Sequence, residues 1–358
     1  MRSNNISQWK TLRGQMQPRA SDLTVKGLAD WVKNNTVDRD PDFQRRDRWG
    51  AAQQSRLIES FLVGIPVPPI YLKVEEDGTY TVIDGRQRLT AVSEFVDGGL
   101  RLEGLDFIKE IEGKTYSALP DDFKRALSVE PAIRAVTVGS EANPNSEMTI
   151  EVFHRLNTGG IQLEDQEIRN ALFGGPLNSL IERLARNPFM VKQMKTDEGT
   201  QGFKKMKDHE YVLRFLTFRK YGEAAASTPS AHMNKYMREN RYAEEGYLMG
   251  LAEDFNQMVE RSSESLGILA FRRWSLEQNE WRDQQNVAVF DAQSLAIQQL
   301  SDSDFDRLLS SKHKIEAALK EVFADPEFDS SISGATASKK AYRYRVQRMR
   351  QAFDSVIA

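Results

Sequence analysis

The 358-residue chain contains no cysteine, and this excludes disulfide bonds, thiol catalysis and cysteine-ligated zinc sites. It also lacks a long apolar run. The longest one, residues 61–72 (FLVGIPVPPIYL), is too short to cross a bilayer and contains three prolines. Residues 1–10 lack the apolar core of a signal peptide. We therefore expect a soluble, cytoplasmic protein that does not contact a membrane.

Histidine is scarce, and neither sign of charge dominates. The four histidines are His154, His209, His232 and His313, and they lack the paired spacing of a histidine metal site. The formal net charge is −3, so the chain has no global excess of positive charge for nucleic acid. Any contact with DNA is therefore predicted to use a local basic surface.

The patterns that are present predict an α+β protein with two domains, residues 1–175 and 176–358. Helical and strand patterns alternate in the first domain, whereas nearly every periodic stretch of the second predicts helix. The first domain is expected to contain helices at residues 22–35 (capped by Ser21 or Asp22), 51–64 and 87–96, a hairpin at 66–83 and a strand at 132–138.

The stretch at residues 79–96 (TYTVIDGRQRLTAVSEFV) changes from a strand pattern to a helical one at Asp84 and Gly85. Glycine allows a turn or a close backbone approach, and the following helix N-terminus suits a phosphate. Arg86 and Arg88 oppose the helix dipole, so they either pair with acids elsewhere or bind an anion. The stretch therefore predicts either a capped tight turn or a phosphate site, with Arg88 expected to be exposed.

A second stretch, FHRLNTGGIQLEDQEIRNALFGG, places Asn157, Thr158 and Gly160 between two predicted helices. Backbone amides at paired glycines, together with polar side chains, suit a phosphate, but the same pattern is typical of a helix C-cap followed by a loop. The acids at residues 164–167 are either a solvated helix start or ligands of Mg²⁺.

Two further groups of basic residues have alternative interpretations. Gln44 and Arg45 lie in a predicted loop before a helix, either as ligand-binding residues or as part of a surface arginine cluster. Residues 338–351 (SKKAYRYRVQRMRQ), which include Arg343, contain no acid and too few apolar positions for a deep core face. This run predicts either a solvated helix paired with acids or a surface that contacts phosphates of DNA or of a nucleotide.

In their order along the chain, the motifs resemble the N-terminal domain family of GmrSD-type, modification-dependent restriction endonucleases. The motifs are FQR, LIESFLVGIPVPPIYL, YTVIDGRQRLTAVSEF, FHRLNTGGIQLEDQEIRNAL and LRF, within roughly residues 20–220. The resemblance implies a ParB/sulfiredoxin-like domain with a small sheet, followed here by a mainly helical domain. Family members usually read Asp-Gly-Gln-Gln-Arg, and Arg86 replaces the first glutamine. This departure bears on nucleotide preference and phosphate contacts.

The resemblance implies that the chain binds and hydrolyses a nucleoside triphosphate with Mg²⁺, in a pathway that cleaves DNA in defence against phage. Asp84 is then expected to position Mg²⁺ or a water, Gln87 to orient phosphate or water, and Arg88 to hold phosphate. The expected nucleotide-binding residues are Gln44, Arg45, Gly85, Arg86, Arg88, Asn157, Thr158, Gly160 and Arg343.

Relatives often carry an HNH nuclease domain, which the histidines of this chain do not support. We expect a separate nuclease or defence-system subunit to cut the DNA. The alternative is a non-enzymatic, nucleotide-gated DNA-binding or clamp protein, and a carboxylate-only nuclease site is also open. The sequence leaves open the nucleotide base, the DNA modification sensed and the oligomeric state.

Overall fold

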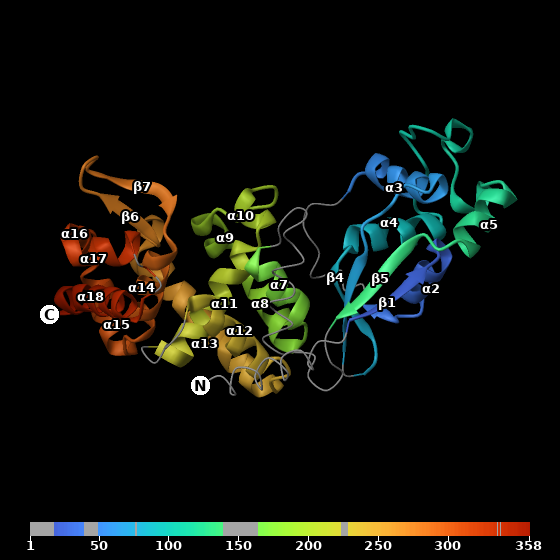
Figure 1. Ribbon diagram of the computed structural model, residues 1–358. Helices are drawn as coiled ribbons and strands as arrows, with labels where there is room; N and C mark the ends of the chain where they lie inside the picture. The colour runs from blue at the N-terminus through green and yellow to red at the C-terminus, as the bar shows by residue number, and fades with distance from the viewer. Residues whose placement is uncertain are drawn as a thin grey trace, which may run out of the picture. The chain divides into compact units, whose positions relative to one another are not determined.

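The computed structural model describes residues 18–38, 49–75, 77–138, 164–222, 228–334, 336 and 338–358 (Figure 1). The chain divides into two compact units, Met1–Leu172 and Phe173–Ala358, and each is described by itself. The first unit combines a mixed sheet with helices, and the second is mainly helical. The predicted α+β class is confirmed, and the ParB/sulfiredoxin-like topology stays a prediction.

Within the described residues, the first unit is built on a five-stranded sheet with the order β1-β5-β3-β4-β2. β1 and β5 are antiparallel, β5 and β3 are parallel, β3 and β4 form an antiparallel hairpin, and β2 lies parallel to β4. The hairpin confirms the one predicted at residues 66–83. The strands are β1 (Arg19–Leu23), β2 (Val37–Asp38), β3 (Ile70–Val74), β4 (Tyr80–Asp84) and β5 (Ile133–Val138).

The helices of the first unit pack on one another and share one apolar core with the strands. α2 and α3 both contact α4. The core includes Leu28 from α2, Ile70 and Val82 from the hairpin, and Val92 and Phe95 from α4, all buried. The helical elements are α2 (Val25–Lys33), α3 (Ala51–Val63), α4 (Arg86–Val96), η2 (Lys109–Ile111), η3 (Tyr116–Ala118), α5 (Asp121–Val129) and α7 (Asp165–Leu172).

The helix predicted at residues 22–35 starts later than expected. Residues 19–23 form β1, and the helix begins at Val25 with Thr24 as its N-cap, whose side chain accepts from the Gly27 N–H. Asp22 is not a cap, because it pairs with Arg134 of β5 across the strands. Pairing with a distant strand outweighs the local helical spacing here.

The second unit consists of packed helices with one antiparallel hairpin, β6–β7. Its central helix is α14, in which every residue from Ala288 to Ile297 is buried, and which contacts α11, α13 and α18. Among the described residues, no helix is long and apolar enough to cross a membrane. The elements are α8 (Pro176–Ala185), α9 (Pro188–Met194), α10 (Gln201–Lys204), α11 (Lys207–Tyr221), α12 (Pro229–Asn240), α13 (Glu245–Ser265), η6 (Gly267–Leu269), β6 (Arg272–Ser275), β7 (Glu280–Gln285), α14 (Val287–Gln298), α15 (Asp302–Ser310), η7 (Lys312–Lys314), α16 (Ile315–Ala324), α17 (Pro326–Ser333) and α18 (Lys339–Ile357).

The basic run at residues 338–351 forms the first part of α18, and the expectation that this helix has no deep core face is wrong. α18 packs on α14, α16 and α17. Its buried residues include Tyr342, Val346, Met349 and Phe353, which recur at the three- and four-residue spacing of one helix face. The arginines obscured this periodicity in the sequence.

Candidate functional site

The candidate site is the turn between β4 and α4, at residues 84–88. β4 ends at Asp84, which lies opposite Tyr71 of β3, and α4 begins at Arg86. Buried residues on both sides fix the turn: Val82 in the strand and Leu89 in the helix. The strand, the turn and the helix therefore form one rigid local structure, and the predicted site residues at positions 84–88 lie together in it.

Gly85 is required for two local reasons. Its φ of +98° lies in the left-handed region that favours glycine. A Cβ built on it would also lie 2.5 Å from the Cγ2 atom of Ile70 and 3.1 Å from the Nη2 atom of Arg88. Any side chain here would therefore displace the β3 strand residue, the arginine or both.

Arg88 is bound into the turn. Its Nη2 atom donates to Asp84 Oδ2 at 2.9 Å and to the Pro69 carbonyl oxygen at 3.1 Å. Its side chain is 14% exposed and that of Asp84 is 41% exposed, so the prediction of an exposed Arg88 is wrong. Within the described part of the chain, the buried Nε atom of Arg88 has no hydrogen-bond acceptor. The guanidinium thus has donor capacity that the turn itself does not use.

The start of α4 has the electrostatics of an anion site. Its N-cap is glycine, which has no side chain to accept hydrogen bonds from the first-turn amides, and the first turn contains no acid. Gln87 accepts a hydrogen bond from the Trp49 N–H at 3.3 Å, which joins the turn to the segment that leads into α3. Arg86 is half-buried beside it. The partial positive charge of the helix and the charge of Arg86 therefore lie at this helix end, where Asp84 offsets the charge of Arg88.

α7 contacts β4, the strand that leads into the turn, and carries a polar network that is buried. Gln166 donates to Asn170 at 2.8 Å, and Arg169 donates to Gln166 at 2.9 Å and contacts Asp165 at 3.4 Å. Glu167 accepts a hydrogen bond from the Glu164 N–H at 2.8 Å. A glutamate three residues into a helix commonly makes this contact with the backbone at the helix start. These contacts favour the helix-start interpretation of the acids over a Mg²⁺ site. The sequence analysis did not identify Gln166, because a single glutamine within a helical pattern gives no indication that it is buried in a polar network.

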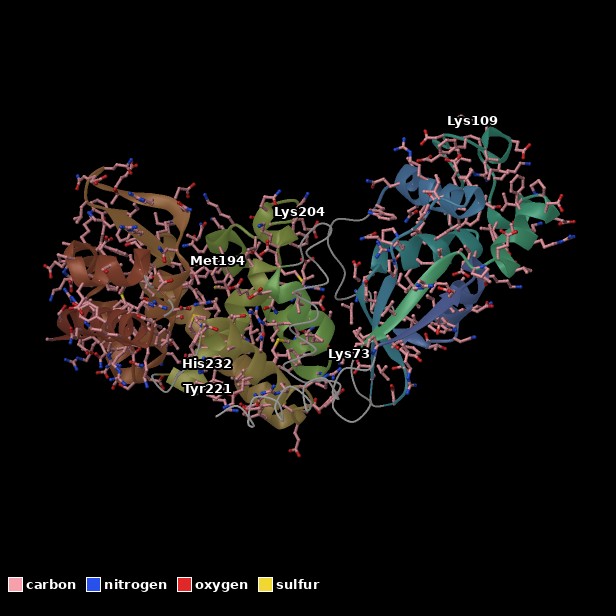
Figure 2. The ribbon with its side chains drawn as sticks, viewed as in Figure 1. Lys73, Lys109, Met194, Lys204, Tyr221 and His232 are labelled. Atoms are coloured by element: carbon pink, nitrogen blue, oxygen red, sulfur yellow. The ribbon has the colours of Figure 1, made fainter. Side chains whose placement is uncertain are left out.

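Lys73 holds α7 in place and was also missed. Its side chain, labelled in Figure 2, is fully buried. Its Nζ contacts both Glu75 carboxylate oxygens, at 2.9 and 3.0 Å, and the Leu172 carbonyl oxygen at 3.3 Å. Thr81 of β4 donates to the same glutamate at 2.6 Å. Because a buried ammonium requires partners, this contact links β3, β4 and the end of α7. The only sequence signal was a lysine in a strand otherwise rich in apolar residues.

The remaining predicted site residues fall into two groups. Arg343 belongs to the second unit, where it is exposed on α18. Five others lie outside the described residues: Gln44, Arg45, Asn157, Thr158 and Gly160. Across the described ranges there is no cluster of three or more histidine, aspartate or glutamate side chains that could hold a metal ion.

The other arginines of α18 are held by acids or carbonyl groups of the second unit. Arg345 is 1% exposed and contacts Asp291 of α14 at 3.0 Å, and the same carboxylate binds Arg214 of α11 at 2.6 Å. Arg348 contacts Asp325 at 3.1 Å. Arg345 therefore clamps helices together and does not form a phosphate-contacting surface.

Burial lowers the pKa of Arg345, Asp291 opposes this, and the nearby Arg214 lowers it further, so that the pKa lies below its ordinary value. For Arg214 burial also lowers the pKa, but the attraction to Asp291 outweighs it and the pKa is raised. Asp291 thus compensates both buried guanidinium groups, and Glu210, 3.7 Å from Arg214, adds to the compensation of that residue.

Residues 28–174 match the family model described as GmrSD restriction endonuclease, N-terminal domain. The match includes the whole β4–α4 turn and confirms the resemblance that the sequence motifs predicted. This part of the chain is similar to the N-terminal domain of those endonucleases, and the family implies a role related to restriction systems. No curated protein and no solved structure gave a match.

Proposed function

We propose that the first unit binds a nucleoside triphosphate with Mg²⁺ at the β4–α4 turn and hydrolyses it. In this proposal the protein is a cytoplasmic component of a phage-defence system of the modification-dependent restriction type. It acts on DNA together with a separate effector nuclease. The family match supports the restriction context, and the geometry of the turn supports the choice of site.

The observation that carries the proposal is the placement of Arg88. Its guanidinium is oriented by Asp84 and the Pro69 carbonyl, and it lies in the first turn of a helix whose N-cap offers no side-chain acceptor. An arginine held rigidly at a helix N-terminus is well suited to phosphate, because less conformational entropy is lost when the ligand binds. A turn that served only to reverse the chain would need Gly85 but not a cation at this point.

In hydrolysis, a water attacks the γ-phosphorus, the bond to the β,γ-bridging oxygen breaks, and the nucleoside diphosphate and inorganic phosphate leave. Arg88 stabilises negative charge on the phosphate oxygens, and Gln87 orients phosphate or the attacking water. Gly85 lets the backbone approach the ligand. Asp84 would hold Mg²⁺, which would neutralise phosphate charge.

The test compares Asp84→Asn with Asp97→Asn, the matched substitution at the C-cap of the same helix. Asparagine keeps an oxygen that can accept from Arg88, so the fold is retained while the carboxylate charge is lost. Thermal unfolding is followed with each of the four NTPs, with and without Mg²⁺. A ligand at 100 times its Kd stabilises the folded state by about 2.7 kcal/mol. Wild type and Asp97→Asn should show this Mg²⁺-dependent gain with at least one NTP, and Asp84→Asn should lose it.

Equal NTP-induced shifts in Asp84→Asn and Asp97→Asn would place the nucleotide elsewhere. Phosphate release then separates the enzyme from the alternative, a nucleotide-gated DNA-binding or clamp protein. Release stimulated by DNA supports hydrolysis as the function, whereas nucleotide-dependent retention of DNA without turnover supports the clamp. Addition of a candidate nuclease to the same reaction tests the expected partner, because DNA cleavage should then require both proteins and NTP.

A further inference from the structure

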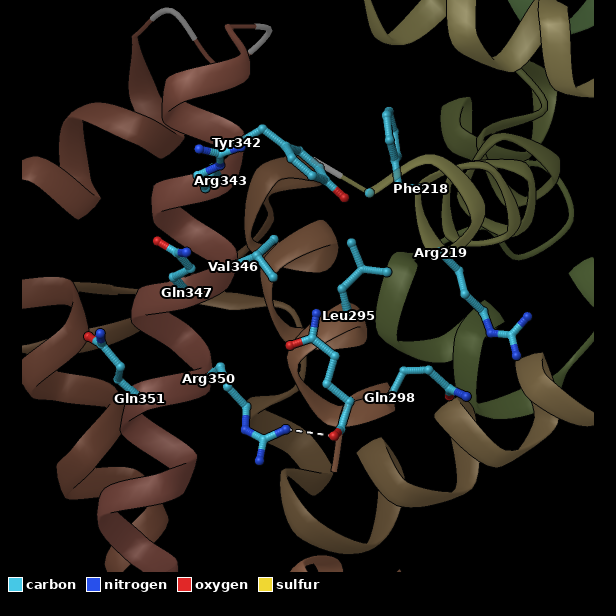
Figure 3. Close-up of a pocket in the computed structure, with 12 residues that line it drawn as sticks. Phe218, Arg219, Leu295, Gln298, Tyr342, Arg343, Val346, Gln347, Arg350 and Gln351 are labelled. Carbon is cyan, nitrogen blue, oxygen red and sulfur yellow. Dashed lines mark hydrogen bonds between the residues drawn. The ribbon is translucent and has the colours of Figure 1, made fainter. Parts of the chain in front are cut away.

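The second unit contains a pocket of about 500 Å³ that none of the contacts described above uses (Figure 3). Its walls come from the end of α11, the end of α14 and one side of α18. Small-molecule sites typically have volumes of about 300–1,000 Å³, with an apolar interior and a few polar groups. The pocket has this size, and its lining likewise combines apolar residues with polar and charged ones.

The floor of the pocket is apolar and partly aromatic. Phe218, Leu295, Tyr342 and Val346 are buried residues that line it. The Phe218 and Tyr342 rings lie with centroids 5.1 Å apart and planes at 40°. A planar ring system entering from solvent would lie against aromatic and aliphatic faces, which is the favourable environment for a heterocycle.

The rim of the pocket is cationic. Arg219, Arg343 and Arg350 line it, and none of its twelve lining residues in the described part of the chain is an aspartate or glutamate. Arg219 pairs with Asp254 at 2.6 Å. Arg350 pairs with Asp354 at 2.8 Å and donates to the Gln299 carbonyl at 2.6 Å, the dashed line of Figure 3. Arg343 is exposed on α18. An anionic group outside the apolar floor would therefore meet guanidinium donors suited to a phosphate.

Side-chain amides also line the pocket. Gln298, Gln347 and Gln351 line the wall, and each carries both a donor and an acceptor. In the part of the chain that the structure describes, the buried Oε1 atom of Gln298 has no hydrogen-bond donor. Because the terminal torsion of glutamine is roughly two-fold, a half-turn of this amide presents either its oxygen or its NH₂ group to a ligand.

We propose that this pocket binds a nucleotide, with the base on the Phe218–Tyr342 floor, the base edge at the glutamine amides and the phosphate at Arg343. The aromatic rings, the glutamine amides and the arginines among the lining residues suit a base, its polar edge and a phosphate, respectively. The same chemistry is present in a free mononucleotide and in one nucleotide of single-stranded DNA. The site lies in the second unit and goes beyond the function proposed for the β4–α4 turn.

The test uses full-length protein in the Asp84→Asn background, which removes Mg²⁺-dependent binding at the turn. The ligands are the nucleoside monophosphates, measured by calorimetry, and a labelled 12-nucleotide single strand, measured by fluorescence anisotropy. Arg343→Glu is compared with Lys339→Glu, which reverses an exposed charge on the same helix outside the pocket. We expect Arg343→Glu to weaken binding at least tenfold and Lys339→Glu less than threefold. The log–log salt slope should fall by about one for Arg343→Glu.

The results also identify the source of the nucleotide. If monophosphates bind and compete with the single strand, both use the pocket; if monophosphates alone bind, the ligand is a free nucleotide. Gln298→Leu removes the amide at nearly constant volume. It should reduce discrimination among the four bases, and Arg343→Glu should still weaken binding in this variant. Equal losses in Arg343→Glu and Lys339→Glu, or no loss in either, would overturn the proposal. A negative result for this pocket does not change the NTP-binding result for Asp84→Asn. The proposed site at the β4–α4 turn and the proposed site in the second unit can therefore fail independently.

Discussion

Replacement of Gly85 by alanine tests the local physics of the site. The new Cβ would lie 2.5 Å from Ile70 Cγ2, whereas carbon atoms in favourable contact are about 3.5–4.0 Å apart. Relieving such overpacking costs roughly 1–3 kcal/mol. Holding a residue with a Cβ at positive φ costs about a further 1–2 kcal/mol. We therefore expect Gly85→Ala to lower the free energy of unfolding by about 2–5 kcal/mol.

The two contributions can be separated with Ile70→Leu. This change removes the branched Cγ2 methyl at nearly constant volume and should itself cost less than about 1.5 kcal/mol. Gly85→Ala should then be about 1 kcal/mol or more less destabilising in the Ile70→Leu background than in the wild type, a coupling typical of residues in contact. Urea unfolding of the wild type, both single variants and the double variant gives the coupling energy directly.

Two results would refute this reasoning. A loss below about 1 kcal/mol in Gly85→Ala would mean that the turn relaxes without strain, since even the conformational part alone is expected to reach that value. Identical losses in the two backgrounds would mean that the Ile70 contact does not limit the position. NTP binding by the same variants shows whether Gly85 is also needed for the ligand. If Gly85→Ala folds in the Ile70→Leu background but no longer binds NTP, the added Cβ keeps the phosphate away from the backbone of the turn.

Two further substitutions test buried charges. Asp291→Ala leaves the buried Arg214 and Arg345 without their shared carboxylate and should lower the free energy of unfolding, measured in urea, by about 3–5 kcal/mol. Asp254→Ala removes a carboxylate from a half-exposed pair and should lower it by no more than about 1 kcal/mol. Equal losses in the two variants would contradict the role of Asp291 in holding the helices together. Burial raises the pKa of Glu59, but hydrogen bonds from the N–H groups of residues 106–108 outweigh this and the pKa is lowered. Its contribution to stability is therefore present above the unfolded pKa of about 4.3 and is lost as pH falls through the folded pKa. The stability difference between wild type and Glu59→Gln should shrink as urea unfolding is repeated from pH 7 down to pH 3, and a constant difference would contradict it.

Local patterns predicted the elements that position the site. The expected helices at residues 51–64 and 87–96 correspond to α3 and α4, and the hairpin and the strand at 132–138 correspond to β3, β4 and β5. These elements have one apolar face, so their periodicity is visible in the sequence. Asp84 and Gly85 were recognised because the change of period from strand to helix marks the turn itself.

Other elements could not be predicted because they lack a distinct periodic face. α14 is buried on all sides, so polar and apolar residues do not alternate with the helical period. β7 reads EWRDQQ, a polar strand whose pairing with β6 is not evident from local composition. In the site, the contacts of Arg88 with Pro69 and of Lys73 with Leu172 depend on residues 19 and 99 positions away along the chain. Spacing within one motif carries no information about such partners.

The burial of Arg88 changes how the motif should be interpreted. From the sequence, two arginines at a helix N-terminus predicted either pairing with acids or an anionic ligand, because their charges oppose the dipole. In the structure Asp84 and the Pro69 carbonyl offset that cost for Arg88, so the unfavourable charge by itself no longer requires a ligand. The argument for a ligand now rests on preorganisation: the contacts that stabilise the guanidinium also fix its direction. Removing Arg88 would therefore weaken folding and binding together, which is why Asp84→Asn, which keeps the arginine and its acceptor, discriminates between a structural turn and a nucleotide site.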